Sequence, residues 1–279
     1  MTRLSIDATN PACWQVVIDN PPINLYDPEM FAELRLLMDA IEASRDLKVV
    51  VFSSANPDYF IAHYDVVRGR TIPELPGAAP FTEWPNFVTR LSQSRVVSIA
   101  KIRGRARGHG SELALACDMR FAGRERAVFA QIEVGMGVVP GGGATEWLSF
   151  LAGRSRTLEI ILGADDFDAD TAALYGWINR SLPDAELDAF VEDLARRIAS
   201  FDARTLEIAK KLINARAPIP TDADRWSSNH VFLGTAARPE TRERVHRLMA
   251  KGLQQDGEFE RALGREIADE DGDGEPFSG

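Results

Sequence analysis

The sequence predicts an α/β fold. A unit of strand, turn and helix recurs at 47–66, 95–117 and 127–152, and the repeats share a pattern rather than residues. The strand LKVVVFSS, at 47–54, is almost continuously apolar, which is typical of a parallel sheet covered on both faces. After residue 153 the pattern is mostly helical. Parallel strands covered by helices account for all three observations.

The first third of the chain alternates between strand and helix. WQVVID, at 14–19, predicts a strand, and the segment 28–44 predicts a helix because its apolar residues recur at helical spacing. Those residues are Met30, Phe31, Leu34, Leu37, Met38 and Ile41. Glycines and prolines at 65–85 predict a long irregular loop, of the kind that often forms a lid or pocket wall. A helix is expected at 87–94.

The middle of the chain repeats this alternation before helices take over. The predicted strands are RVVSIAKIRG (95–104), MRFAG (119–123) and AVFAQIE (127–133). Predicted helices begin in GSELALACD (110–118) and PGGGATEWLSFLAG (140–153). We divide the chain into a core at 1–202, a helical region at 203–265 and an acidic tail at 266–279. The tail has almost no apolar residues, so we expect it to be disordered.

Composition and charge exclude several classes of partner. The 279-residue chain is 45% hydrophobic and carries a net charge of −10, whereas nucleic-acid binding requires a basic face. Residues 1–14 lack the apolar core of a signal peptide, and no run approaches the roughly 20 apolar residues of a membrane span. Cys13 and Cys117 lack metal-ligand spacing, so we expect no metal site. Low cysteine usage fits a reduced compartment, and we expect a cytoplasmic protein.

The stretch GHGSELALACD, at 108–118, combines a glycine turn with a carboxylate at the start of a helix. The first helical turn offers unpaired N–H groups at its positive dipole end, and glycines let a ligand approach them. Such a place stabilises an anion that forms on a carbonyl oxygen, and Glu112 beside it can move a proton at the adjacent carbon. Glutamate is also favoured in the first turn of any helix, so a purely structural role stays open.

The neighbouring residues argue against two common kinds of active site. Ser111 lacks the flanking glycines of the G-x-S-x-G nucleophile elbow, because His109 and Leu113 stand at those positions. The PGGG run at 140–143 lacks the Lys-Ser/Thr of a phosphate-binding loop. A second candidate carboxylate is Glu133, which follows a predicted strand and precedes that run. It is either catalytic or the solvated end of a strand.

Three ordered segments carry a resemblance to a known family. They are SIAKIRGRARGHGSELALACDMRFAG (98–123), FAQIEVGMGVVPGGGATEWL (129–148) and LEIILGADDFDADTAALYGWINRSLP (158–183). Together they resemble the crotonase superfamily, the enoyl-CoA hydratases and isomerases. Upstream, VVVFSSANPDYFIAHYDV (49–66) is similar to the family's F-x-A-G-x-D segment, and PPINLYDPEM (21–30) is similar to its N-A-L entry into the first helix. The C-terminal part of the chain matches only loosely.

The resemblance implies a fold, a ligand and an assembly. The fold is a ClpP-like crotonase spiral of ββα repeats, followed by C-terminal helices that trimerise. The ligand is an acyl-CoA thioester, so coenzyme A enters as part of the substrate and no separate cofactor is expected. The expected assembly is a homotrimer or a dimer of trimers, with no nucleic-acid or membrane partner.

The resemblance also assigns the reacting groups. Backbone N–H groups of Tyr64 and His109 hold the thioester oxygen as it becomes an enolate. Glu112 and Glu133 match the two glutamates that act on one water in hydratases. The N–H of Gly141 lies where the family helps to place that water.

A four-residue segment matches the part of the family that binds coenzyme A, and its first residue meets the adenine through the backbone. The segment consists of Ala62, His63, Tyr64 and Asp65. Val67 stands where hydratases often carry a lysine for the CoA phosphates. Arg68 or Arg70 is the expected substitute.

The chain departs from the family pattern around the assigned groups. His63 and Tyr64 stand where the family often has small residues, and His109 stands at a usual glycine. His63 and His109 either meet the thioester or narrow its entrance. Ile132 replaces the usual proline before Glu133, which predicts a looser loop.

The presence of both glutamates predicts a 2-enoyl-CoA hydratase, a lyase that adds water across a conjugated C=C. A double-bond isomerase, which requires only one carboxylate, stays open. So does a catalytically silent acyl-CoA-binding subunit, if Tyr64 and His109 crowd the oxyanion site. Phe81, Trp84 and Phe87 either line a pocket for the acyl group or form a satellite core under the long loop, and we favour the second interpretation.

Overall fold

The computed structural model describes residues 2–68, 83–217 and 220–268. Its strands are β1 (Leu4–Asp7), β2 (Cys13–Ile18), β3 (Val49–Ser54), β4 (Tyr59–Ile61), β5 (Val97–Ile102), β6 (Arg105–Arg107), β7 (Met119–Gly123), β8 (Val128–Ala130), β9 (Phe167–Asp168) and β10 (Arg180–Leu182). Its helices are α1 (Pro28–Ala43), α2 (Glu83–Gln93), α3 (His109–Ala116), α4 (Ala144–Leu151), α5 (Arg154–Gly163), α6 (Ala169–Tyr175), α7 (Asp184–Ala199), α8 (Ala203–Asn214), α9 (Asp222–Ala236), α10 (Pro239–Lys251), α11 (Glu258–Arg261) and α12 (Leu263–Glu266).

The strands form two sheets, which confirms the predicted α/β class. The six-stranded sheet has the order β1-β2-β3-β5-β7-β10, and all its pairs are parallel except β1 with β2. The four-stranded sheet has the order β4-β6-β8-β9, parallel up to the antiparallel pair of β8 and β9.

Each repeat of the spiral crosses from the large sheet to the small one and then enters a helix. The repeats are β3-β4-α2, β5-β6-α3 and β7-β8-α4. The predicted unit at 47–66 contains two strands and no helix, since its helix, α2, begins only at Glu83. The residue pattern therefore missed β4 and β6. These strands are three residues long, too short to show an alternating pattern.

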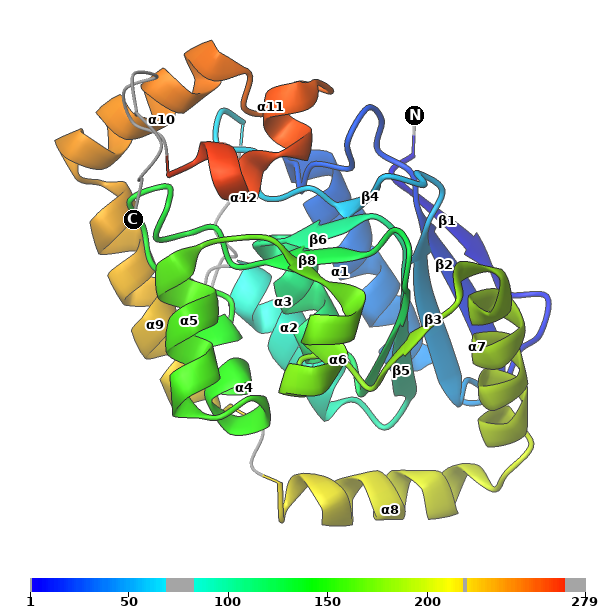
Figure 1. Cartoon of the computed structure of the whole chain (residues 1–279). Helices are drawn as coiled ribbons and strands as arrows, with labels where there is room; N and C mark the ends of the chain where they lie inside the picture. The colour runs from blue at the N-terminus through cyan, green and yellow to red at the C-terminus, as the bar shows by residue number, and fades with distance from the viewer. Residues whose placement is uncertain (1, 69–82, 218–219, 269–279) are drawn as a thin grey trace.

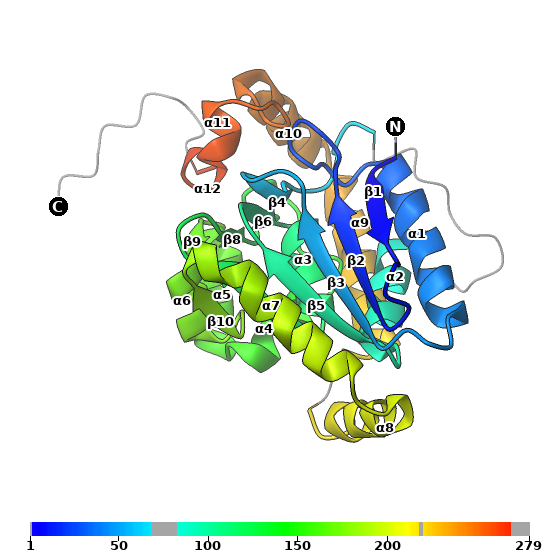
Figure 2. The same ribbon diagram turned by 90° about the vertical axis from the view of Figure 1, so that its right-hand side faces the viewer.

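Helices cover both faces of the large sheet, as the apolar run at 47–54 predicts. Alternate side chains of a strand point to opposite faces. Val49 and Val51 pack against α7, whereas Val50 and Phe52 pack into the main core with α1 and α3. Figure 2 shows α7 on one side of the strands and α1 on the other.

The C-terminal helices have two different placements. Figure 1 shows α8 at the bottom of the view, whereas α9 to α12 run up the left side and across the top. Lys210 joins α8 to the body, because its buried Nζ donates to the carbonyl of Val96 at 2.9 Å and to Asp118 at 2.7 Å. Ile267 is 1% exposed and packs with Leu263, so the folded chain continues past the boundary expected at 265. The predicted disordered tail otherwise falls at 269–279, outside the described residues. No helix in the described ranges is long and apolar enough to cross a membrane.

Candidate active site

The glycine turn before α3 places backbone donors at the start of the helix. Gly108 has φ of +48° and ψ of −116°, and its N–H donates to the carbonyl of Ala130 at 3.1 Å. Gly108 thus takes the conformation that an L-residue avoids, and His109 begins α3 with ordinary geometry. Within the ranges that the structure describes, the N–H of His109 donates to no protein group.

Glu112 lies one turn into α3 and is 1% exposed. Its Oε1 accepts the N–H of Gly142 at 2.7 Å, and its Oε2 accepts the indole N–H of Trp84 at 2.7 Å. The Nδ1 of His109 lies 3.4 Å from Oε2. Burial raises the pKa of Glu112 to about 7, and the Trp84 and Gly142 hydrogen bonds limit the rise because they favour the ionised form. The carboxylate is thus held in one orientation and titrates near neutrality.

Glu133 follows β8 and is 8% exposed. Its two oxygens lie 3.3 and 3.2 Å from the amide Nε2 of Gln131, which donates to the carboxylate. A Cβ placed on Gly108 would fall 3.2 Å from Glu133 Oε1, so this carboxylate borders the glycine turn. Burial and, second, the charge of Glu112 raise the pKa of Glu133 to about 8. The two predicted carboxylates therefore interact, and Glu133 is not the solvated end of a strand.

Tyr64 lies beside His109, at the glycine turn. A parallel bridge joins it to Tyr26, in which the N–H of Tyr26 donates to His63 at 2.9 Å and the N–H of Asp65 donates to Tyr26 at 3.0 Å. The Tyr64 ring centroid lies 5.0 Å from that of His109. The structure thus brings together the two residues to which the resemblance assigns the oxyanion donors.

The imidazole of His109 is enclosed by aromatic rings. It stacks on Trp84 at 4.7 Å with an interplanar angle of 14°, and its centroid lies 4.9 Å from that of Tyr26. Burial, with a smaller contribution from His63, lowers the pKa of His109 to about 3. The ring is therefore neutral near pH 7. It forms part of the wall of the candidate site and does not act as an acid.

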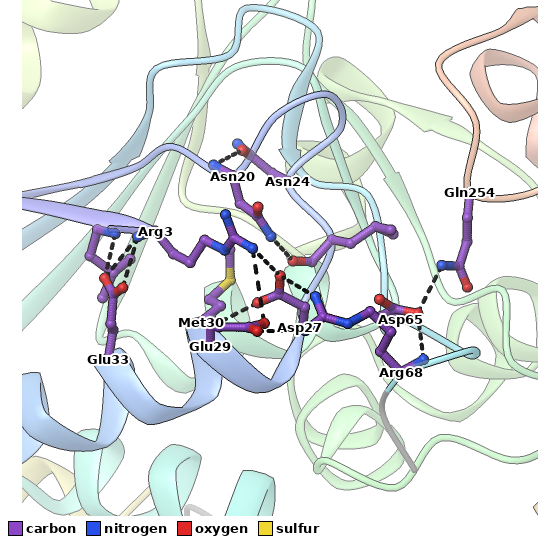
Figure 3. A network of polar contacts seen from close by, with 12 residues as sticks. Arg3, Asn20, Asn24, Asp27, Glu29, Met30, Glu33, Asp65, Arg68 and Gln254 are labelled. Atoms are coloured by element: carbon purple, nitrogen blue, oxygen red, sulfur yellow. Dashed lines mark hydrogen bonds and ion pairs between the residues drawn. The ribbon is translucent and has the colours of Figure 1, made fainter. Parts of the chain in front are cut away.

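His63 and Asp65 point toward the C-terminal region. The ring of His63 contacts Glu260 of α11, so His63 and His109 face different neighbours. Asp65 Oδ1 accepts the N–H of Val67 at 3.0 Å, the N–H of Arg68 at 2.9 Å and the Nε2 of Gln254 at 3.0 Å. Figure 3 shows Gln254 and Arg68 on either side of Asp65.

The expected CoA-phosphate residues have other partners here or are not described. Arg68 pairs with Glu29 at 2.5 Å and with Asp27 at 3.4 Å (Figure 3). Arg70 lies outside the described residues. Ala62 is buried, and its N–H donates to Ile23 at 3.2 Å. Arg68 thus already pairs with two carboxylates in this structure.

Gly141 and Gly142 have distinct surroundings. The carbonyl of Gly141 accepts the side-chain amide of Asn229 at 3.3 Å, and a Cβ on Gly141 would lie 2.7 Å from Phe232 of α9. The N–H that reaches a catalytic candidate is that of Gly142, the next residue. The resemblance thus pointed to this loop without indicating the contact of Gly142 with Glu112, and the water-placing role of Gly141 stays a prediction.

The enoyl-CoA hydratase/isomerase family model matches residues 8–255. The chain belongs to the enoyl-CoA hydratase/isomerase family. The family assignment confirms the predicted resemblance and the crotonase fold, and it confirms an enzyme of the enoyl-CoA hydratase/isomerase type.

Similar proteins come from plants and bacteria. A provisionally named mitochondrial enoyl-CoA hydratase 2 of Arabidopsis thaliana is 31% identical over 201 residues, which are 72% of this chain and 66% of that protein. A short-chain-enoyl-CoA hydratase of Clostridium acetobutylicum is 28% identical over 71% of this chain and 76% of that protein. The crystal structure of a Streptomyces avermitilis protein, provisionally assigned as an enoyl-CoA hydratase, has a TM-score of 0.89 and 37% identity. The matched region covers 95% of this chain and 96% of the Streptomyces avermitilis chain.

Sequence reasoning missed or misplaced several residues around this family site. Trp84 and Phe87 belong to the main core rather than to a satellite cluster, and Trp84 also binds Glu112. Phe81 lies outside the described residues. Ile132 is buried against the C-terminal helices, and the looser loop expected there stays a prediction. The aromatic content of 81–87 was the one signal for Trp84, whereas nothing local indicated Glu260.

Proposed function

We propose that this protein is a 2-enoyl-CoA hydratase that adds water across the conjugated C=C of an acyl-CoA thioester. The observation that carries the proposal is the pair of buried, interacting carboxylates, Glu112 and Glu133, in unequal surroundings. Glu112 accepts the N–H groups of Trp84 and Gly142, whereas the side-chain donor to Glu133 is the amide of Gln131. Two such carboxylates together hold one proton near neutrality, which gives one base and one acid.

The unequal hydrogen bonding assigns the two roles. Ionised Glu112 takes a proton from water as the water oxygen bonds to Cβ of the substrate, and the C=C electrons move onto the thioester oxygen. Tyr64 and His109 donate backbone N–H groups to that enolate oxygen, each lowering the barrier by roughly 3 kcal/mol. Protonated Glu133 then gives its proton to Cα. The product is a 3-hydroxyacyl-CoA, and a proton exchange between the two carboxyls restores the starting state.

The remaining features of the proposal follow from the family. Coenzyme A enters with the substrate, contacts the segment from Ala62 to Asp65, and no separate cofactor takes part. The N–H of Gly141 helps to place the water. The protein works in the cytoplasm as a homotrimer or dimer of trimers. Exposed apolar side chains on α8, including Leu212 and Ile213, support such an assembly.

A double-bond isomerase is the second candidate, and one observation favours it. Glu112 accepts donors from two distant segments, whereas Glu133 borders the glycine turn and accepts the amide of Gln131, two residues away. One carboxylate is sufficient to move a proton between two carbons of an enoyl chain.

The absorbance of the enoyl-thioester band distinguishes these functions. The wild-type protein is mixed with crotonyl-CoA and, in parallel, with cinnamoyl-CoA. We expect absorbance to fall with at least one ester as the conjugated double bond is hydrated. No change with either ester, together with a rise when a 3-enoyl-CoA is supplied, would instead establish an isomerase. Tight binding without turnover of any ester would indicate a silent acyl-CoA-binding subunit.

A further inference from the structure

The side chain of His63 lies between two hydrogen-bond acceptors. Its Nδ1 is 2.8 Å from the carbonyl of Tyr64, and its Nε2 is 3.3 Å from both carboxylate oxygens of Glu260. A carbonyl and an ionised carboxylate can only accept. Both ring nitrogens must then carry hydrogen, which makes His63 an imidazolium paired with Glu260. Both side chains are buried, so the pair is shielded from water.

Other polar groups around this pair favour the ionised form of Glu260. The N–H of Gln254 donates to Glu260 Oε2 at 2.8 Å, and Nη1 of Arg107 lies 3.9 Å from Oε1. Arg107 is itself paired with Asp166, with bonds of 2.8 and 2.5 Å, so its charge is largely balanced.

The remaining titratable neighbours leave His63 protonated and Glu260 ionised. Burial, and second the charge of Glu260, raise the pKa of the Tyr59 hydroxyl to about 12, so that group stays neutral. His109 is neutral, as described above. Glu133 is a further titratable neighbour: a Cβ added to Gly108 would lie 3.2 Å from Glu133 Oε1 and 3.7 Å from the Cβ of His63. Burial alone would lower the pKa of His63, but the carboxylate of Glu260 outweighs it and the pKa is raised.

Gln254, six residues before Glu260, makes further hydrogen bonds to the residues that follow Tyr64. Gln254 accepts the N–H of Val66 at 2.7 Å with its side-chain oxygen, and its Nε2 donates to Asp65 at 3.0 Å (Figure 3). Gln254 has φ of +64°, a left-handed conformation that a non-glycine residue adopts at some cost. Gln254 and Glu260 thus contact residues on both sides of Tyr64. The family match ends at residue 255, before Glu260.

We propose that Glu260 and His63 are positioning residues: their buried ion pair joins α11 to the Tyr64 segment and fixes the backbone N–H that receives the thioester oxygen. The inference rests on the proposed function for its effect on turnover. The C-terminal chain beyond the family match is therefore part of the active-site framework of its own subunit.

The charge of His63 is tested without turnover. Long-range ¹H–¹⁵N correlation spectra of protein labelled with ¹⁵N-histidine show whether each ring nitrogen carries a proton. The His63 signals are identified by their loss in His63→Asn. At pH 7, just above the ordinary histidine pKa of 6.5, we expect wild-type His63 to have both nitrogens protonated. In Glu260→Gln one nitrogen should lose its proton. A neutral His63 ring in the wild-type spectrum overturns the proposal whether or not Glu260→Gln folds.

Turnover tests the positioning role. We expect Glu260→Gln to lower kcat for the ester that the wild type hydrates by about tenfold or more, with KM changed far less. The reason is that the variant misplaces the N–H group of the oxyanion hole but still binds the substrate. Glu260→Asp keeps the charge and should recover part of that loss. Glu258→Gln makes the same change at an exposed position of α11 and should match the wild type.

The two proposals fail in distinguishable ways. A wild-type protein that hydrates no enoyl-CoA refutes the proposed function, while the histidine spectrum still decides the state of His63. A wild type that turns over, with Glu260→Gln indistinguishable from Glu258→Gln, refutes the positioning role alone.

Discussion

The indole N–H of Trp84 donates to Oε2 of Glu112 at 2.7 Å, and the same indole stacks on the ring of His109. Trp84 lies on α2 and Glu112 on α3, so two successive helices of the spiral meet at this bond. Trp84 is also part of the main apolar core. A core side chain therefore fixes the orientation and the acidity of the proposed base.

Loss of the Trp84 donor should weaken Glu112 as a base. In Trp84→Phe the pKa of Glu112 rises further, because one hydrogen bond to the ionised form is removed. At neutral pH we expect kcat to fall by about tenfold, the low end for a bond to a charged group. The acidic limb of the pH–rate profile should move to higher pH. Trp147→Phe, the same change in α4, is the control, and an equal effect there would attribute the loss to packing.

Gly142 has no room for a side chain. An added Cβ would lie 2.2 Å from both Glu112 Oε2 and the Nε1 of Trp84. Gly142→Ala should therefore lower the free energy of unfolding by about 1–3 kcal/mol and reduce turnover. Gly163→Ala is the matched control, because no atom lies within 4 Å of its added Cβ and alanine favours the helix. Denaturant titration measures both variants, and equal stability of the two would contradict this packing.

The rate should depend on pH through the singly protonated carboxylate pair. Glu112 acts as a base when ionised, so kcat/KM should rise as pH increases through about 7. Glu133 acts as an acid when protonated, so kcat/KM should fall as pH increases through about 8. The two apparent values belong to the pair. A profile that is flat across this range would exclude the acid–base assignment.

The stability contributed by Glu133 should also depend on pH. Its folded pKa is raised from an ordinary 4.5 to about 8, so its contribution is fully present below about 4.5 and is lost as pH rises through about 8. Glu133→Gln is neutral at every pH. It should therefore raise Tm relative to the wild type at alkaline pH more than at acidic pH. Calorimetry with Glu258→Gln as the exposed control measures the difference, and a pH-independent shift would contradict the burial argument.

Much of the fold could be predicted because its signals are local. The helix at 28–44 and the strand at 47–54 show their periods within one element, and the observed α1 and β3 nearly coincide with them. Strands β4 and β8 are held by their neighbours in the small sheet, so their sequence alone does not reveal their bounds.

The candidate site divides in the same way. Glu112 and Glu133 were found because each lies beside a local glycine-rich pattern. Trp84 reaches Glu112 across 28 residues, and Glu260 reaches His63 across 197, and neither contact leaves a pattern along the chain. His63 could be recognised as unusual at its position, but the buried carboxylate that explains it comes from a distant helix.

The central claim, that two carboxylates act on one water, is tested most directly by comparing Glu112→Gln with Glu133→Gln. Each variant is assayed for hydration of the ester that the wild type accepts, and binding of that ester is measured by calorimetry. We predict that each change abolishes hydration and leaves binding largely intact, because the amide preserves shape and removes the proton transfer. Wild-type turnover in either variant would contradict the two-carboxylate mechanism and leave the other glutamate as the only acid–base group.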